Sequence, residues 1–259
     1  MIYLDNAATT KPCDEAKAAV MKGLEVFGNP SSLHRAGLDA ELLVSDAREA
    51  IADALGVTPD EVYFTSGATE SNNTAIFGAY KAHGKRKKRV VISSVEHPAV
   101  KNPAQELEDM GCEVIRISPD ENGEINARDI LAAVNEDTFL VSCMLVNNEN
   151  GYILPVEKAF SMIKKKYPQV LTHCDCVQGF MKIPVKAKKL NADMISLSGH
   201  KIYAPKGIGA LYVKKGVHIP PFMLGGGQEK GFRSGTESVP LICGFGAAVK
   251  KLAPNVSVN

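Results

Sequence analysis

Short apolar runs alternate along the chain with longer stretches in which apolar residues recur every three or four positions. Runs of the first kind predict buried strands, and stretches of the second kind predict amphipathic helices. Their alternation predicts an α/β architecture with a mainly parallel sheet packed between helices. The predicted strands cover residues 62–65, 90–93, 113–117, 138–145, 170–174, 194–197 and 208–213; a helix follows each of the first two strands, and further helices cover 127–134 and 155–166.

Two chemically distinctive residues follow predicted strands. Asp175 comes directly after the run 170–174, and Lys201 follows the run 194–197. Open α/β sheets bind ligands at the carboxyl ends of their strands. A lysine amine becomes reactive there when burial or a cationic neighbour lowers its pKa from the ordinary value of about 10.4. A carboxylate beside a pyridine nitrogen, with a lysine to hold an aldehyde, is what pyridoxal phosphate requires from a protein.

A third feature is suited to bind a phosphate group. The predicted strand 62–65 leads into a turn of small residues at 65–72 and then into a helix. Backbone N–H groups at a helix N-terminus, together with the Thr69 hydroxyl, favour a bound anion. Taken singly, each of these features has an ordinary structural explanation, such as a surface lysine or a turn cap. Their combination predicts a cofactor site.

Seven sequence motifs extend this interpretation, because they occur in the order found in one enzyme family. The chain resembles the cysteine desulfurases of the iron-sulfur type, which belong to the class V aminotransferase group of pyridoxal phosphate enzymes. The resemblance extends from the first residues to about Val249. The motifs lie at residues 3–10 (YLDNAATT), 27–34 (FGNPSSLH), 65–72 (TSGATESN), 96–97 (EH), 146–149 (VNNE), 198–201 (SGHK) and 233–236 (RSGT).

The resemblance implies catalytic roles for three residues. Lys201 is expected to bind the aldehyde of pyridoxal phosphate as an imine. Asp175 is expected to pair with the pyridinium nitrogen. His97 is expected to stack on the ring face and to relay protons. Gln178 is expected to bind the cofactor, by a hydrogen bond to the phenolate oxygen of the ring.

Further contacts are implied for the phosphate and the substrate. Asn148 is expected to reach the substrate carboxylate or the ring oxygen. Thr236 matches a family residue that contacts the phosphate of the neighbouring subunit, so the site is expected to be complete only in a homodimer. The residues expected to hold the phosphate within one subunit are Ala68, Thr69, Ser198 and His200.

The resemblance also implies a fold and its domain organisation. We expect residues 1–259 to form the large domain of the aspartate aminotransferase fold (fold type I), with a mixed central sheet and an N-terminal segment. Most of the C-terminal small domain is expected to be absent. In the family, a mobile loop beyond the large domain carries the persulfide-forming cysteine, and a substrate-binding arginine follows it. Neither has a matching position in this sequence.

None of the six cysteines is a convincing substitute. Cys143, Cys174 and Cys243 lie in apolar stretches, where a free thiol usually packs as a small core residue. Strand alternation is expected to point Cys174 and Cys176 away from Asp175. A Cys-x-Cys pair without further spaced ligands does not predict a metal site, so none is expected. Cys13, in a polar segment, is expected to be the most exposed.

The expected reaction converts L-cysteine to alanine and passes the sulfur to a thiol acceptor, as in iron-sulfur cluster assembly. Because the family's cysteine has no counterpart here, that thiol would come from a partner chain, a continuation of this one or a free thiol. Two alternatives stay open: an aminotransferase or lyase of the same cofactor class acting on a related amino acid, and a non-catalytic relative that binds cofactor and dimerises. A sulfur-acceptor or scaffold protein is the expected partner.

Composition and charge narrow the possible binding partners and cellular locations of the protein. The chain is 45% hydrophobic and 23% charged, with a net charge of +1, which argues against a nucleic-acid or anionic-membrane binder. No apolar run is long enough to span a bilayer, and Asp5 interrupts any secretory signal. Scattered cysteines without a disulfide pattern favour a reducing, cytoplasmic location.

Overall fold

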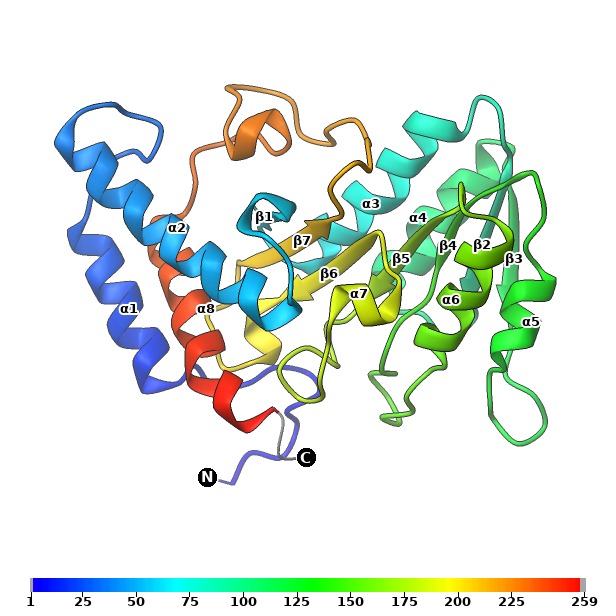
Figure 1. The fold of residues 1–259 in the computed structure, drawn as a ribbon. Coiled ribbons are helices and arrows are strands. Elements are labelled where there is room, and N and C mark those ends of the chain that lie inside the picture. The colour runs from blue at the N-terminus through cyan, green and yellow to red at the C-terminus, as the bar shows by residue number, and fades with distance from the viewer. Residues whose placement is uncertain (1, 257–259) are drawn as a thin grey trace.

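A seven-stranded mixed sheet forms the centre of the protein in the computed structural model, which describes residues 2–256 (Figure 1). The strand order is β1-β7-β6-β5-β4-β2-β3. Strands β2 to β6 run parallel to one another, whereas β7 is antiparallel to both β6 and β1. The mainly parallel sheet predicted from the sequence is confirmed. The strands are β1 (Val62–Thr65), β2 (Arg89–Ser93), β3 (Glu113–Ile117), β4 (Thr138–Ser142), β5 (Leu171–Asp175), β6 (Met194–Ser198) and β7 (Gly209–Val213).

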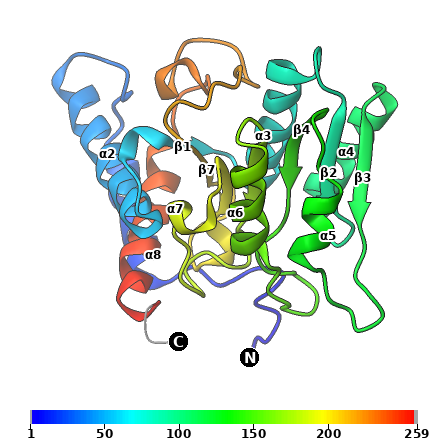
Figure 2. The same ribbon diagram turned by 45° about the vertical axis from the view of Figure 1, so that its right-hand side comes forward.

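Helices cover both faces of the sheet, and each layer has its own apolar core (Figure 2). Alternate residues of one strand serve the two cores: Val90 and Ile92 pack with α3 and α4, while Val91 packs in the other core with α2, α5, α6, α7 and α8. Both faces are therefore buried, which explains the continuous apolar strand sequences. The helices are α1 (Asp14–Glu25), α2 (Arg35–Leu55), α3 (Ala68–His83), α4 (Pro98–Asp109), α5 (Ala127–Ala132), α6 (Val156–Lys166), α7 (Ala187–Leu190) and α8 (Val239–Leu252), with short 3-10 turns η1 (Pro59–Glu61), η2 (Gly199–Lys201), η3 (Glu229–Gly231) and η4 (Ala253–Asn255).

Predicted and observed boundaries differ most at β4. The apolar run predicts a strand through residue 145, but β4 ends at Ser142. Beyond that point the Met144 N–H donates to the Glu96 carboxylate at 2.7 Å, because Glu96 follows the neighbouring strand β2 and takes the place of a ladder acceptor. Helix α5 likewise ends two residues before its predicted end. Helices α1, α2, α7 and α8 were not predicted; α8 packs against both α1 and α2.

Among residues 2–256, none of the helices combines the length and apolar character that crossing a membrane requires.

Candidate functional site

A cavity of about 900 Å³ opens at the carboxyl ends of the parallel strands. Its walls come from the segments that follow β1, β2, β4, β5 and β6, together with the N-terminal segment. Parallel strands deliver these segments to one edge of the sheet, so side chains far apart in sequence converge there. The N-terminal segment is fixed to this edge by the Thr10 N–H, which donates to the His200 carbonyl at 2.9 Å.

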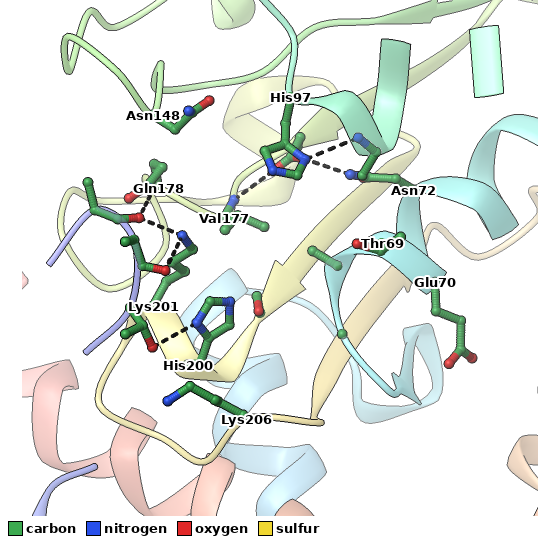
Figure 3. A pocket seen from close by; sticks show the side chains of 18 of the residues that line it. Thr69, Glu70, Asn72, His97, Asn148, Val177, Gln178, His200, Lys201 and Lys206 are labelled. Atoms are coloured by element: carbon green, nitrogen blue, oxygen red, sulfur yellow. Dashed lines mark hydrogen bonds between the residues drawn. The ribbon is translucent and has the colours of Figure 1, made fainter. Parts of the chain in front are cut away.

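Nearly all the residues expected to form the site lie around this cavity (Figure 3). Thr236 is the exception: it is exposed, between η3 and α8, and does not line the cavity. The expected residues that line it are Ala68, Thr69, His97, Asn148, Asp175, Gln178, Ser198, His200 and Lys201.

Asp175 provides a buried carboxylate on the cavity wall, with only 5% of the residue exposed. Its oxygens accept hydrogen bonds from Asn72 Nδ2 at 2.8 Å and from the Val177 N–H at 3.0 Å. Burial raises the pKa of Asp175, and these hydrogen bonds and the charges of His97 and Lys201 oppose that rise. A buried carboxylate held only by neutral donors is suited to pair with a cationic ligand group.

Lys201 lies in η2, directly after β6, and its amine faces the N-terminal segment (Figure 3). Lys201 Nζ donates to the carbonyl oxygens of Ala7 at 2.5 Å and Ala8 at 2.8 Å. Burial lowers the pKa of Lys201, while the charges of Asp5 and Asp175 oppose the change. The lowered pKa increases the fraction of neutral amine that can react with a carbonyl compound.

His97 is the N-cap of α4 and presents its ring to the cavity (Figure 3). Its Nδ1 accepts a hydrogen bond from the Ala99 N–H at 3.1 Å. Because Nδ1 is the acceptor, the neutral ring carries its proton on Nε2. The cap therefore fixes both the position and the tautomer of the imidazole.

The turn after β1 forms an anion-binding surface at the N-terminus of α3. The first N–H groups of a helix have no acceptor within it, so those of Ala68 and Thr69 are available to a ligand. Gly209 permits the turn to approach β7, because a Cβ there would lie 2.7 Å from Gly67 Cα. After β6, His200 also lines the cavity, and its Nδ1 lies 3.0 Å from Thr9 Oγ1. Burial and nearby lysines lower the pKa of His200.

Several cavity residues received no role from the sequence. Asn72 holds Asp175, and its own Oδ1 is buried without a partner in the described structure. Lys206 and Asp5 add charges to the wall. Asn72 belongs to a motif that the sequence analysis recognised, but its contact with Asp175 spans 103 positions. Sequence spacing gives no signal for such a contact.

Gln178 is engaged with protein groups in this structure. Its Nε2 donates to the Ala7 carbonyl at 2.9 Å, and its Oε1 accepts from Lys182 Nζ at 2.6 Å. The same Ala7 oxygen accepts from Lys201, so Gln178 and Lys201 share one acceptor.

No cysteine lines the cavity, and the structure describes all six. Cys174 and Cys176 pack in the apolar core with their sulfur atoms 3.4 Å apart, which confirms that they point away from the site. Burial raises the pKa of Cys143 and of Cys174. Cys13 is only half-buried, and so is Cys243, which was expected in the core; Cys243 instead lies on α8 near Gly23 of α1.

The cavity suits pyridoxal phosphate by the chemistry of its donor set. It combines an amine of lowered pKa, a buried carboxylate without an ion-pair partner, and free N–H groups at a helix start. These match an aldehyde, a pyridinium nitrogen and a phosphate. Within residues 2–256, no group of three or more His, Cys, Asp or Glu side chains could hold a metal ion.

Known proteins are similar to this chain in sequence and in fold. A NifS/IcsS protein homolog of Lactobacillus delbrueckii is 46% identical over 254 residues, covering 97% of this chain and 66% of that protein. Cysteine desulfurase IscS of Dictyoglomus turgidum is 44% identical over 250 residues, covering 96% and 63%. The chain therefore spans less than two thirds of these curated relatives.

Solved structures confirm the predicted fold class. A structure titled NifS-like protein has a TM-score of 0.96 at 41% identity, covering 99% of this chain and 71% of that one. SspA in complex with cysteine has a TM-score of 0.93 at 39% identity, covering 96% and 72%. The family model for aminotransferase class-V matches residues 2–258. The chain belongs to the aminotransferase class-V family.

Proposed function

We propose that this chain is a pyridoxal phosphate-dependent, cysteine desulfurase-like protein that takes sulfur from L-cysteine and leaves alanine. Enzymes of its family depend on this cofactor, and several relatives are named cysteine desulfurases. The observation that carries the proposal is the convergence of Lys201 and Asp175 on one cavity at adjacent strand ends. The solved complex of SspA with cysteine supports the choice of substrate.

Three side chains would act on the cofactor and substrate. Bound pyridoxal phosphate supplies an electron sink that stabilises negative charge on a substrate amino acid. Lys201 is the amine that would hold the cofactor aldehyde. Asp175, fixed by Asn72, would stay ionised opposite a cationic ring nitrogen. His97, fixed by its cap, would cover the ring and carry a proton on Nε2.

Other wall residues would orient the two ligands. Gln178 would leave its present contact with Ala7 to hydrogen-bond the ring oxygen. Asn148 would bind the substrate carboxylate. The groups proposed to hold the phosphate are Ala68, Thr69, Ser198 and His200.

None of the six cysteines lines the cavity of its own subunit, so the sulfur-accepting thiol would be supplied from outside it. In the proposed reaction a thiolate attacks the sulfur of bound cysteine and forms a sulfur–sulfur bond. The carbon–sulfur bond breaks with its electron pair left on the carbon side, and uptake of a proton there gives alanine. That thiolate would belong to a partner chain, to a continuation of this chain or to a free thiol. The same observation favours a second candidate, a cofactor-binding scaffold that leaves the chemistry to other proteins.

We propose further that the protein works as a cytoplasmic homodimer in iron-sulfur cluster assembly, with residues 1–259 as the large, cofactor-binding domain. The exposed position of Thr236, outside the cavity of its own subunit, supports its assignment to the phosphate of a neighbouring subunit.

A turnover assay separates the candidates. Purified protein loaded with pyridoxal phosphate is incubated with L-cysteine and dithiothreitol, and sulfide and alanine are quantified. We expect both products in equal amounts, well above the rate with free pyridoxal phosphate. Sulfide at the free-cofactor rate from a fully loaded protein would favour the scaffold, and a keto acid product would favour an aminotransferase.

Asp175→Asn is the most informative variant for this assay. Removing the charge opposite the ring nitrogen should reduce sulfide release by at least about tenfold. The same change should raise the free energy of unfolding at pH 8, because it removes a buried carboxylate whose pKa is raised by burial. Gain of stability with loss of turnover identifies a functional charge, whereas unchanged turnover would contradict the role of Asp175.

A further inference from the structure

A carboxylate is located at the proposed phosphate turn. Glu70 lies in the first turn of α3 and lines the cavity, and its Oε2 accepts a hydrogen bond from the Ser66 N–H at 2.8 Å. Its side chain is only 8% exposed. Although burial raises the pKa of Glu70, hydrogen bonds from Arg233 and Ser66 outweigh it and hold the pKa below its ordinary value. Glu70 is therefore negatively charged.

Arg233 is the cation that pairs with this carboxylate. Its Nε lies 2.8 Å from Glu70 Oε1 and its Nη2 lies 3.2 Å from Oε2, so the contact is bidentate. The arginine side chain is 20% exposed, so the pair is partly shielded from water. Arg233 comes from a distant segment, 163 positions along the chain.

That segment is fixed at a second point as well. The carboxylate of Glu229 accepts from both terminal nitrogens of Arg48 at 2.7 Å and from the Phe64 N–H of β1 at 2.9 Å. Glu229 is thus held to β1 and Arg233 to the first turn of α3. Arg233 does not have to anchor the segment alone.

An unpaired Glu70 would oppose the proposed cofactor, because its negative charge lies at the turn where the phosphate would bind. We propose that Arg233 is a positioning residue that neutralises Glu70, so that an anion can bind at the N-terminus of α3. This inference rests on the proposed function. It assigns Arg233 an electrostatic effect on cofactor binding without direct contact to the cofactor.

Charge neutralisation and simple anchoring predict different patterns. If Arg233 only anchors its segment, then losing either partner of the pair should weaken cofactor binding equally. If Arg233 neutralises Glu70, then losing Arg233 is harmful, losing Glu70 is harmless, and losing both is harmless.

The test compares Arg233→Gln, Glu70→Gln and the double variant by fluorescence titration with pyridoxal phosphate, at low and at high salt. We expect Arg233→Gln to weaken binding roughly tenfold at low salt and much less at high salt, because screening weakens repulsion. Glu70→Gln should bind at least as tightly as the original protein. The double variant should return to within about threefold of it.

Two variants serve as controls. Arg116→Gln breaks a partly exposed arginine–glutamate pair with Glu108 elsewhere in the fold and makes the same change in net charge, so it should leave affinity unchanged. Arg233→Lys keeps the charge and should retain most of the affinity. Inorganic phosphate, which lacks the ring and aldehyde, is then used as a competitor. Its affinities for the variants should follow the same order as those of pyridoxal phosphate.

Equal losses in Arg233→Gln, Glu70→Gln and the double variant would overturn the proposal in favour of anchoring. If Arg233→Gln does not fold, the affinities of Glu70→Gln and Arg233→Lys for pyridoxal phosphate are compared instead. Weaker binding by Glu70→Gln than by Arg233→Lys overturns the proposal. Tighter binding by Glu70→Gln supports it. If the original protein itself binds no pyridoxal phosphate, the proposed function fails, and with it this inference.

Discussion

Glu96 illustrates how one buried side chain links the segments that form the site. It is 1% exposed, and its Oε1 accepts from Ser93 Oγ at 2.5 Å and from the Met144 N–H at 2.7 Å. Burial raises the pKa of Glu96 to about 8, against the effect of these two hydrogen bonds. Glu96 is therefore largely protonated at neutral pH, and it joins the ends of β2 and β4 beside His97.

The raised pKa predicts a specific pH dependence of stability. Because the folded-state pKa lies above the unfolded value, the stabilisation is complete below about pH 4.5 and is lost as the pH rises through about 8. Glu96→Gln cannot ionise and should avoid this loss. We expect similar free energies of unfolding near pH 5 and an advantage for Glu96→Gln on the order of 5 kcal/mol at pH 9. Chemical denaturation of the original protein and of Glu96→Gln across this pH range measures the difference. Parallel pH profiles of the free energy of unfolding would contradict the raised pKa of Glu96.

Hydrophobic periodicity predicted single site residues only where they follow a strand, and the motif resemblance added other cavity residues such as His97 and Asn148. Asp175 and Lys201 each follow an apolar run, so their convergence at one sheet edge follows from parallel topology. The contact of Asn72 with Asp175 and that of Glu70 with Arg233 could not be predicted in this way. Each depends on how separate segments pack after the sheet has formed.

Strands and helices could be predicted best where their apolar residues follow a clear periodic pattern. The strands at 62–65 and 113–117 have the predicted boundaries, because turn residues bracket each apolar run. Helix α8 gave no clear pattern, since its sequence is apolar on most sides and it packs against both α1 and α2. Helix α2 exposes Leu38 and Leu42, which blurs the division into apolar and polar faces.

Close packing between β7 and the phosphate turn gives a prediction for Gly209. A Cβ at this position would lie 2.5 Å from the Leu197 carbonyl oxygen and 2.7 Å from Gly67 Cα, and backbone atoms cannot move aside as side chains can. Gly209→Ala should therefore lower the free energy of unfolding by about 1–3 kcal/mol. It should also weaken binding of pyridoxal phosphate, because the turn is displaced. Denaturation and cofactor titration test both effects, and a variant with unchanged values would show that the turn adapts freely.

The whole molecule leaves large apolar side chains uncovered on one side. Helices α1 and α2 lie at the outer edge of the structure (Figure 1). Phe27 and Leu33, in the connection between them, are 90% and 93% exposed, and Leu42 on α2 is 64% exposed. Exposed apolar groups gathered in one region usually mark an interaction surface. This surface suits the proposed association of two copies.

Sedimentation analysis tests that association. We expect the mass of a dimer, and we expect Phe27→Ser combined with Leu33→Ser to shift the protein towards monomer, because the change removes apolar area from the contact. Thermal stability serves as the control, since neither side chain is buried within the subunit. A monomer at every concentration would contradict the homodimer and the role proposed for Thr236.

The most direct measurement of the central claim identifies the lysine that carries the cofactor. The protein is loaded with pyridoxal phosphate, reduced with borohydride to fix the linkage, and mapped by peptide mass spectrometry. Lys201 should carry the label, and Lys201→Ala should abolish it. Lys206 and Lys182 serve as internal controls, since the first shares the cavity wall and the second lies within reach of Gln178. Label on either of these lysines, or none on Lys201, would contradict the proposed site.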